Sequence, residues 1–461
     1  MKLTAGEIAA AVGGTLLQGD PGTVLEHVAL DSRTMQGADL FVPIRGEKND
    51  GHRYMAGAFA AGAAASLTEE GLPEGLPAGT CVIAADRTRA ALQRLGSYMR
   101  DHYRGSVVGI TGSVGKTSTR EMVKLALSAG GTVTGTEKNL NSQLGVPVTL
   151  CHMDAQAERA VLEMGISMPG EMQCLAAIAR PTAAVVTNIG ISHLEYLGSR
   201  ENIAREKMHI ADHLGTEGTV ILNGDDVLLR AVRTDAGKLF FGFGPESDVQ
   251  ACCVREDESG QRFTVRLRGS GKLPAMEFEC ILPVTGRHHI YNALAAIAAA
   301  AVTGVDPEQA AAALRGFRCF AHRGEWKLAG NVKILDDCYN ASPDSVRAAL
   351  QTLCAEKITG KRAAFLADMK ELGAQTAEAH REIGREAASL PVALYVLLGD
   401  ATRETEQELL QAGKKVLRAE SREDAVRLLR DNLQPGDAVL IKGSNSFGLD
   451  KAVESLCTQM S

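Results

Sequence analysis

The chain has 461 residues, too many for one hydrophobic core, so two or three domains are expected. Apolar residues make up 45% and charged residues 23%, a balance typical of a globular protein, which excludes a collagen-like or wholly disordered chain. With 49 Lys and Arg against 56 Asp and Glu, the formal charge is −7, which opposes general attraction to nucleic acid or anionic lipid.

The N-terminus and the cysteines indicate the compartment. Residues 1–7 lack the basic-then-apolar order of a signal peptide, and no stretch approaches the roughly 20 apolar residues of a membrane span. The ten cysteines include no C-x-x-C pair, so neither a zinc site nor a disulfide framework is indicated. We therefore expect a cytoplasmic protein with reduced thiols and no membrane insertion.

Residues 1–84 form the first predicted domain. They contain short apolar runs separated by Gly-rich turns, and they end before a helical pattern at residues 90–103. That helix is expected to link this small domain to the next one.

Residues 85–317 form the second predicted domain, in which strands and helices alternate. A buried strand precedes a glycine-rich loop and a helix at 117–127, and Ser199 is a good N-cap for a helix over 200–214. Buried strand-like runs are expected at 107–111, 160–164, 184–187 and 220–222. This alternation predicts a parallel sheet with helices on both faces.

The end of this domain has a different pattern. Residues 248–283 alternate polar and apolar side chains, which predicts an antiparallel patch. Gly269 to Lys272 within it is expected to be a hairpin turn, because no helix follows as a phosphate loop requires. Helices at 290–303 and 307–315 complete the domain.

Residues 318–461 form the third predicted domain, with a second α/β alternation. An amphipathic helix is expected over 422–433. Strands are expected at 332–336, 363–367, 393–398 and 438–441. The predicted fold class is α/β in three domains.

The most informative motif follows the first strand of the second domain. Its glycines let backbone N–H groups turn toward phosphate oxygens, its lysine neutralises the outer phosphates, and its threonine hydroxyl can bind magnesium. The loop consists of Gly112, Ser113, Val114, Gly115, Lys116, Thr117 and Ser118. A strand before it and a helix after it favour nucleotide binding over a chance match.

The loop departs from the common G-x-x-x-x-G-K-[ST] form, because Ile110 stands five residues before Gly115. ATP-dependent ligases of the Mur family carry this shortened loop. Further segments resemble the family's motifs in the family's order, at 136–147, 162–165, 188–195, 204–207, 291–296, 322–325 and 336–345. The chain therefore resembles the Mur ligase family over nearly its whole length.

The resemblance implies the domain plan and the reaction. The first domain would bind a uridine nucleotide, the central one would be a P-loop ATPase domain, and the third, Rossmann-like domain would close on ATP. The segment 336–345 most resembles the members that join D-alanyl-D-alanine to UDP-N-acetylmuramoyl-tripeptide with ATP and Mg²⁺. These ligases make peptidoglycan precursors, and the resemblance favours a monomer.

Three residues are candidates for metal binding. Glu163 ends a buried strand, where open α/β sheets place ligand-binding side chains, and His193 follows the next strand. A histidine in such a place is otherwise more often structural. Lys207 alone would be a solvated lysine on a helix. The resemblance implies that all three serve magnesium, Lys207 after carbamylation by carbon dioxide.

The resemblance also implies nucleotide contacts outside the loop. Asn292 would contact adenine, Arg323 the γ-phosphate and Asp337 the ribose. Considered without the family, they are a helix cap, a surface ion pair and a turn carboxylate. We interpret His288 and His289 as structural, because their spacing does not suit a metal.

Further residues are expected to contact the substrates. In the first domain Arg33 and Arg45 suit a diphosphate and Ser32 suits uracil or ribose, although surface arginines in a turn would look the same. The full set of substrate contacts that the resemblance implies is Ser32, Arg33, Arg45, Gly46, Asn139, Asn141, Asn340, Lys442 and Ser444.

The expected chemistry is phosphorylation of a carboxylate by ATP, followed by attack of an amine on the acyl phosphate. Lys116, Arg323 and magnesium would stabilise the transferred phosphoryl group, so no covalent enzyme nucleophile is needed. One alternative is the preceding Mur ligase, which adds the third residue and carries an Asn-Pro-Arg signature that is missing here. A second is folylpolyglutamate synthetase, which lacks the uridine domain. A third is a catalytically silent nucleotide-binding module. Joint retention of Lys116, Glu163, His193 and Lys207 argues against the last.

Overall fold

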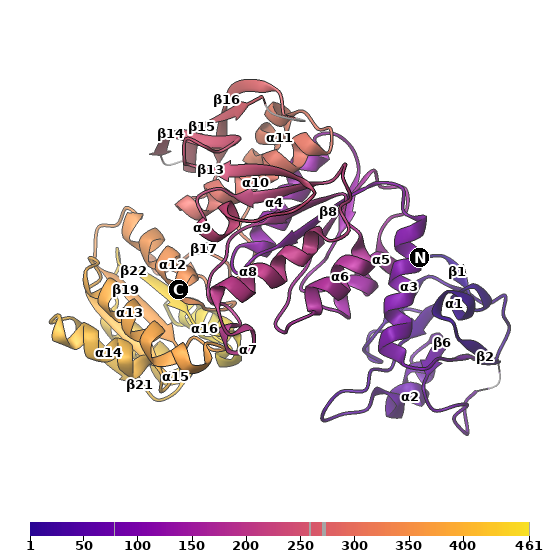
Figure 1. Ribbon diagram of the computed structural model, residues 1–461. Helices are drawn as coiled ribbons and strands as arrows, with labels where there is room; N and C mark the ends of the chain where they lie inside the picture. The colour runs from indigo at the N-terminus through magenta and orange to yellow at the C-terminus, as the bar shows by residue number, and fades with distance from the viewer. Residues whose placement is uncertain (78, 258–259, 270–272, 461) are drawn as a thin grey trace.

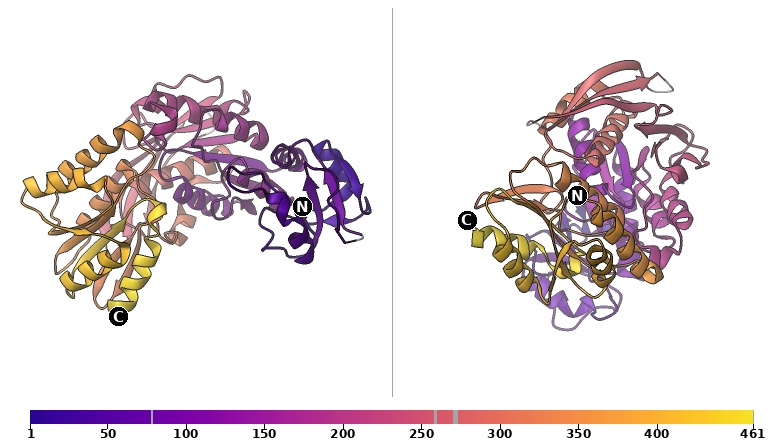
Figure 2. Two further views of the ribbon diagram at one scale, coloured as in Figure 1. Left: turned by 90° about the horizontal axis from the view of Figure 1, so that it is seen from below. Right: turned by 90° about the vertical axis from the view of Figure 1, so that its left-hand side faces the viewer.

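The computed structural model describes residues 1–77, 79–257, 260–269 and 273–460. Three α/β units follow one another in chain order, and the central one lies between the other two (Figures 1 and 2). Their main sheets contain five, nine and six strands among the described residues. The predicted α/β class with three domains is therefore confirmed, whereas the limits 1–84, 85–317 and 318–461 stay predictions.

The first unit is a five-stranded sheet in the order β2-β7-β6-β5-β4, with only β2 antiparallel to its neighbour. The strands are β2 (Thr15–Gln18), β4 (His27–Ala29), β5 (Asp39–Phe41), β6 (Ala63–Thr68) and β7 (Cys81–Ala84), besides the short pair β1 (Leu3–Thr4) and β3 (Val24–Leu25). The helices are α1 (Ala5–Val12) and α2 (Met55–Ala60). The predicted linking helix is α3 (Thr88–His102), which packs against α1 on one side and against helices of the central unit on the other.

The central sheet has the order β16-β15-β14-β13-β12-β11-β8-β10-β9. Its strands are β8 (Ser106–Thr111), β9 (Val133–Gly135), β10 (Arg159–Glu163), β11 (Ala183–Val186), β12 (Thr219–Asn223), β13 (Gly237–Gly242), β14 (Val249–Asp257), β15 (Gly260–Arg268) and β16 (Ala275–Leu282). From β9 to β14 all pairs are parallel, and β14, β15 and β16 are antiparallel. The four predicted parallel strands and the antiparallel patch are confirmed. Residues 270–272 of the predicted hairpin turn lie outside the described residues.

Helices cover both faces of this sheet. Both faces are apolar, because the strands are buried and their alternate residues point to opposite sides. Val108 and Ile110 belong to one apolar cluster, with α4 and α10, while Val107 belongs to the other, with α5 and α6. The helices are α4 (Lys116–Ser128), α5 (Gly145–His152), α6 (Glu171–Ala179), α7 (Leu194–Leu197), α8 (Arg200–Met208), α9 (Val227–Arg230), α10 (Arg287–Val302) and α11 (Pro307–Ala313).

Two helix predictions need correction. Ser199 caps α8 as predicted, since its side chain accepts from the Asn202 N–H, but the α-helix ends at Met208 and continues as a 3₁₀ turn instead of reaching residue 214. The helix expected from residue 290 begins at Arg287, with Gly286 at its N-cap. Asn292 therefore lies inside the helix and does not cap it.

The C-terminal sheet has the order β17-β18-β22-β19-β20-β21, with only β17 antiparallel. Its strands are β17 (Glu325–Ala329), β18 (Val332–Asp336), β19 (Arg362–Ala367), β20 (Leu394–Leu398), β21 (Lys415–Ala419) and β22 (Ala438–Lys442). Its helices are α12 (Pro343–Ala355), α13 (Thr376–Ala388), α14 (Thr402–Gln411), α15 (Arg422–Asn432) and α16 (Asp450–Met460). The four predicted strands and the helix over 422–433 are confirmed. Apolar clusters on both faces again enclose the sheet.

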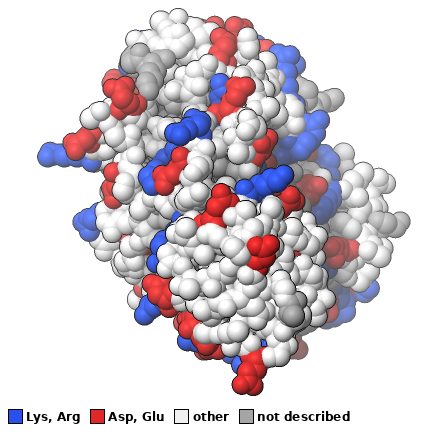
Figure 3. Space-filling view, turned by 90° about the vertical axis from the view of Figure 1, so that its right-hand side faces the viewer, with Lys and Arg blue, Asp and Glu red and all other residues white. Residues whose placement is uncertain are grey.

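The surface carries charges of both signs. On the face shown in Figure 3, Lys and Arg side chains lie among Asp and Glu side chains, with uncharged areas between them. Among the described helices, none combines the length and the apolar composition that crossing a membrane requires.

Candidate active site

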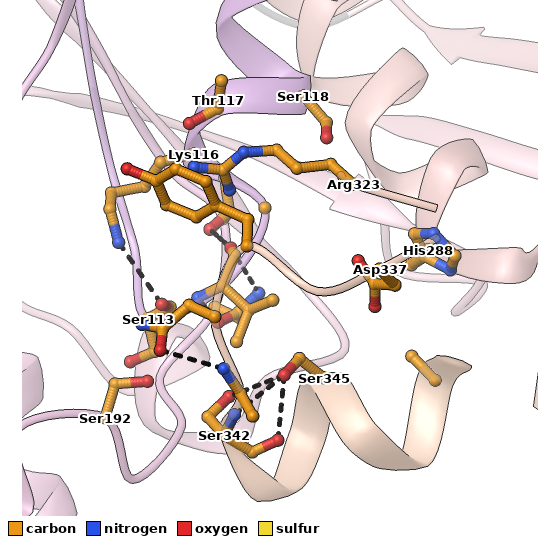
Figure 4. A pocket seen from close by; sticks show the side chains of 18 of the residues that line it. Ser113, Lys116, Thr117, Ser118, Ser192, His288, Arg323, Asp337, Ser342 and Ser345 are labelled. Carbon is orange, nitrogen blue, oxygen red and sulfur yellow. Dashed lines mark hydrogen bonds between the residues drawn. The ribbon is translucent and has the colours of Figure 1, made fainter. Parts of the chain in front are cut away.

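A cavity of about 760 Å³ lies between the central and C-terminal units. In Figure 4 the glycine-rich loop faces Ser342 and Ser345 of α12, with Asp337 and His288 at the side of α10. The predicted site residues that line the cavity are Ser113, Val114, Gly115, Lys116, Thr117, Ser118, Asn141, Glu163, His193, Asn292, Arg323, Asp337, Asn340, Lys442 and Ser444. Those outside its lining are Gly112, Asn139, Lys207 and the N-terminal Ser32, Arg33, Arg45 and Gly46.

Two glycines give the loop its shape. Gly112 has a φ of +150°, and a Cβ there would lie 1.9 Å from the Thr187 hydroxyl oxygen. Gly115 has a φ of +85°, and its Cβ would lie 3.1 Å from the Asn292 Oδ1. At Gly112 the loop backbone therefore passes closer to Thr187 than a side chain permits, and at Gly115 the left-handed backbone favours glycine.

The loop presents donors to the cavity. The first N–H groups of a helix have no intrahelical acceptor, and here they belong to residues that line the cavity, from Lys116 onward. The buried Ser113 hydroxyl has no hydrogen-bond partner among the described residues. Burial lowers the pKa of Lys116, whose amine donates to the Gly112 carbonyl at 2.7 Å, while Glu163 nearby opposes that shift. Such a set of donors fits the phosphates of a nucleotide.

Glu163 lies at the carboxyl end of β10, buried beside the loop. Its Oε1 accepts from the Thr117 hydroxyl at 3.2 Å and from the Asn141 amide at 2.7 Å. Its Oε2 pairs with the Arg120 Nη1 at 3.0 Å. A carboxylate and a hydroxyl side by side are oxygen ligands of the kind that Mg²⁺ prefers, so these residues fit a magnesium ion.

Lys207 is buried, which its polar sequence neighbours do not suggest. Its side chain is 1% exposed, which excludes the solvated lysine that its polar neighbours would suggest. Its amine forms no ion pair within the described part of the chain. Burial lowers the pKa of Lys207 well below its ordinary value, and the charge of Lys116 lowers it further.

His193 follows β11 and adopts a left-handed backbone with a φ of +61°. Its Nδ1 lies 2.6 Å from the Oε2 of Glu371, a residue of the C-terminal unit. This contact crosses the boundary between the two units at the edge of the cavity.

Arg323 enters the cavity from the segment that joins the two units. Its guanidinium lies 3.8 Å from the ring centre of Tyr339, and burial lowers the pKa of the arginine while leaving it a cation. The preceding His322, with a φ of +64°, pairs with the buried Asp336 at 2.9 Å. The surface ion pair considered for Arg323 is not present among the described residues.

Asp337 is held by Lys442. The Lys442 amine donates to the Asp337 Oδ2 at 2.6 Å, to the Asp337 carbonyl at 3.2 Å and to the Asn340 carbonyl at 3.0 Å. An ammonium has three donors, so all of them are used. The Lys442 side chain is buried, lines the cavity and faces the loop that carries Asp337, so its expected direct contact with a substrate stays a prediction.

The remaining predicted residues are placed as follows. The Asn292 Oδ1 accepts from the Thr119 hydroxyl at 3.0 Å, and the Ser444 hydroxyl accepts from the Lys370 N–H at 2.9 Å. His288 and His289 both line the cavity, and His289 is buried, so the structural interpretation of the pair stays a prediction. Asn139 is exposed.

The N-terminal arginines are already paired. Arg33 is exposed and pairs with Asp31, and Arg45 pairs with Asp50 at 2.8 Å and contacts Glu70. They lie on the first unit, away from the cavity. A diphosphate that bound there would have to replace these carboxylates.

Sequence reasoning missed Arg120, Asn188 and Glu371. Arg120 lies four residues after Lys116 and thus on the same face of α4, a spacing that would have indicated it. Glu371 follows the end of β19, so the rule that directed attention to Glu163 applies to it as well. Asn188 accepts the N–H groups of Ser113 and Val114 and so holds the loop.

The fold and this site define a nucleotide-binding protein of the P-loop class, whose cavity is shared by two α/β units. Comparison with known proteins narrows the class. Residues 110–300 match the Mur ligase middle domain, residues 322–445 the Mur ligase glutamate ligase domain, and residues 24–100 the Mur ligase family catalytic domain. The chain belongs to the Mur ligase family, which confirms the resemblance found in the sequence.

Individual relatives are similar over their whole length. The chain is 36% identical over 460 residues to the UDP-N-acetylmuramoyl-tripeptide–D-alanyl-D-alanine ligase of Bacillus subtilis, covering 99% of this chain and 98% of that one. A crystal structure of MurF from Acinetobacter baumannii superposes with a TM-score of 0.89 at 27% identity, covering 99% of both chains. The MurF ligase of Thermotoga maritima, solved in complex with ADP, gives a TM-score of 0.81 at 26% identity, covering 94% of this chain and 98% of that one.

Proposed function

We propose that this protein is the ATP-dependent ligase that joins D-alanyl-D-alanine to UDP-N-acetylmuramoyl-tripeptide in peptidoglycan precursor synthesis. One observation carries the proposal: a phosphate loop faces Arg323 and Asp337 across a single cavity, in a chain that is 36% identical to a ligase of this kind over 99% of its length. ATP is the nucleotide that such a reaction consumes, with ADP and phosphate as products.

The residues suit acyl activation. The terminal carboxylate of the tripeptide attacks the γ-phosphorus of ATP, and the bond from that phosphorus to the bridging oxygen of ADP breaks. The α-amine of the dipeptide then attacks the acyl carbon, and phosphate leaves as the amide forms and the amine loses a proton. Lys116 and Arg323 stabilise the charge on the phosphoryl oxygens, and burial of both cations strengthens that effect. No enzyme nucleophile takes part.

Thr117, Glu163 and His193 are the residues that would hold magnesium. A bound magnesium neutralises phosphate charge and orients the phosphates. Arg120 and Asn141 keep the Glu163 carboxylate in place beside the Thr117 hydroxyl. Asn292 would contact adenine and Asp337 the ribose.

Lys207 would become a carbamate that binds a second magnesium. Carbon dioxide adds to an uncharged amine, and the burial that lowers the pKa of Lys207 favours that form. The carbamate is an anion, so it would also relieve the repulsion between this amine and Lys116.

The substrates would span two units. Ser32, Arg33, Arg45 and Gly46 would bind the uridine diphosphate part, while Asn139, Asn141, Asn340 and Ser444 would contact the peptide parts nearer the cavity. ATP and the uridine nucleotide are cytoplasmic metabolites, which supports a cytoplasmic location. A monomer is proposed, as the resemblance to the family implies.

The proposal is tested by measuring phosphate release from ATP with acceptors and amines offered in pairs. Release only with UDP-N-acetylmuramoyl-tripeptide plus D-alanyl-D-alanine supports it. Release with the dipeptide precursor plus lysine or diaminopimelate would instead assign the preceding step of the pathway, and no release with any pair would refute ligase activity.

Replacing Lys442 with methionine is expected to raise the KM for ATP by roughly 10- to 100-fold, the range for losing a hydrogen bond to a charged group. The reason is that Asp337 would lose the cation that orients it. Steady-state kinetics with each substrate varied in turn check this. The exposed Lys415, whose amine reaches Asn432, supplies a control variant with unchanged kinetics. A rise only in the KM for the dipeptide would instead support the direct contact between Lys442 and a substrate that the resemblance implies.

A further inference from the structure

A segment of the central unit, Thr187 to Glu195, connects the phosphate loop to the C-terminal unit. At its first end the Asn188 carbonyl accepts from the Ser113 N–H at 3.1 Å, and the Asn188 Oδ1 accepts from the Val114 N–H at 3.0 Å. The Thr187 hydroxyl donates to the Val114 carbonyl at 2.6 Å. We call residues 187–195 the bridging segment.

Its other end is attached to the C-terminal unit in three ways. Ile191 packs against the apolar cluster that contains Leu372. The Glu195 N–H donates to the Glu371 carbonyl at 3.3 Å, and the His193 Nδ1 lies 2.6 Å from the Glu371 Oε2. Figure 1 shows α7, which begins within the bridging segment, against the C-terminal unit.

The backbone conformations of His193 and Glu371 indicate that the surrounding structure holds this contact between the two units in place. His193 and Glu371 both have left-handed backbones, with φ values of +61° and +62°. Non-glycine residues persist in this region only where the surrounding structure requires it, and such residues gather at functional sites. Here the two residues with left-handed backbones, from different units, bring their side chains to within 2.6 Å of each other.

A carboxylate beside a metal-binding histidine has a known role, which is to orient the ring. Such a histidine usually donates its second ring N–H to a carboxylate, which fixes the tautomer and the orientation of the ring. The Glu371 carboxylate lies 2.6 Å from Nδ1, close enough to take the N–H of that atom once the ring is aligned, and this would leave the Nε2 of His193 as the ligand atom. Other carboxylates of the cavity are engaged elsewhere: Glu163 pairs with Arg120, and Asp337 pairs with Lys442.

We propose that Glu371 is a positioning residue that orients His193 for metal binding from the opposite unit. The metal site of the central unit is then complete only when the C-terminal unit is docked, and the bridging segment transmits that docking to the phosphate loop. This inference rests on the proposed role of His193 in the ligase and adds Glu371 to it.

The test compares Glu371→Gln, which keeps the size of the side chain, with Glu378→Gln, a control on α13 whose carboxylate is also half-exposed and paired with arginines. Affinity for Mn²⁺ is measured by electron paramagnetic resonance in the presence of a non-hydrolysable ATP analogue. We expect Glu371→Gln to weaken Mn²⁺ binding by roughly 10- to 100-fold, the range for losing the carboxylate partner of a metal-binding histidine. The control variant keeps the wild-type affinity.

A second comparison keeps the inference falsifiable if one variant is poorly folded. In a His193→Ala background, Glu371→Gln is expected to cause no further loss of Mn²⁺ affinity, since its effect acts through the histidine. Unchanged Mn²⁺ affinity in Glu371→Gln, or additive losses in the double variant, would overturn the proposal. A rise confined to the KM for D-alanyl-D-alanine would also overturn it and would place Glu371 at the incoming amine. Failure of the ligase assay would refute the proposed reaction, whereas the Mn²⁺ comparison does not depend on turnover.

Discussion

Replacing Lys207 with alanine is expected to lower kcat by about 100- to 1,000-fold, the range for removing one group that stabilises charge in a transition state. Burial holds the pKa of the Lys207 amine well below its ordinary value, which favours the uncharged form that the proposed carbamate requires, and alanine cannot form that anion. Formation of ADP in a coupled assay with both substrates checks this. Lys207→Arg is expected to be equally inactive, because it restores a cation but forms no carbamate.

Two controls separate the carbamate from a packing effect. Exposed Lys238, whose amine reaches the Val232 carbonyl, gives an alanine variant with unchanged turnover. Wild-type protein depleted of carbon dioxide is expected to lose activity and to regain it with bicarbonate. Wild-type turnover in Lys207→Ala, with thermal unfolding unchanged, would remove Lys207 from the site.

Replacing Arg120 with methionine is expected to lower the free energy of unfolding of the central unit by about 3–5 kcal/mol, the cost of leaving one charge of a buried pair without its partner. Arg120 is 1% exposed, and its Nη1 donates to the Glu163 Oε2 at 3.0 Å and to the Lys138 carbonyl at 2.7 Å. Urea unfolding followed by amide hydrogen exchange in β8 and β10 measures this, since a multidomain chain does not unfold in one transition.

The double variant Arg120→Met with Glu163→Gln provides the internal check. Removing the unpaired charge is expected to recover a large part of the lost stability, as in a double-mutant cycle for a contacting pair. Arg430→Met, at an exposed position beside Asp431, is expected to change stability by less than about 0.5 kcal/mol. If Arg120→Met were as stable as the wild type, the ion pair would have no structural weight.

Among the parallel strands, the sequence predicts those that are buried on both faces and misses strands at the sheet edges. Runs such as 363–367 and 438–441 are apolar throughout, so their burial can be predicted from composition. The missed strands β9 and β21 lie at sheet edges and have mostly half-exposed residues, which removes the apolar signal. The start of α10 was misplaced because Gly286 serves as the cap, a role that glycine shares with many turns.

Some residues of the site could also be predicted from the sequence, and others could not. The phosphate loop is a local motif, and Glu163 was found because the carboxyl end of a parallel strand is a known position for ligands. Lys442 needed the structure, because its partner Asp337 is 105 residues away and nothing local indicates which side it faces. The burial of Lys207 was equally hidden, since its neighbours Arg205 and Glu206 give a polar pattern. The roles given to both residues from the family required a resemblance and not a pattern.

The shared walls of the cavity have a thermodynamic consequence outside the reaction. A nucleotide that contacts both units stabilises their association, by about 2.7 kcal/mol at a concentration 100 times its Kd. The nucleotide concentration would therefore determine what fraction of the time Ile191 stays packed against the apolar cluster of the C-terminal unit. At low nucleotide concentration the two units would separate more readily and expose the apolar contact around Ile191.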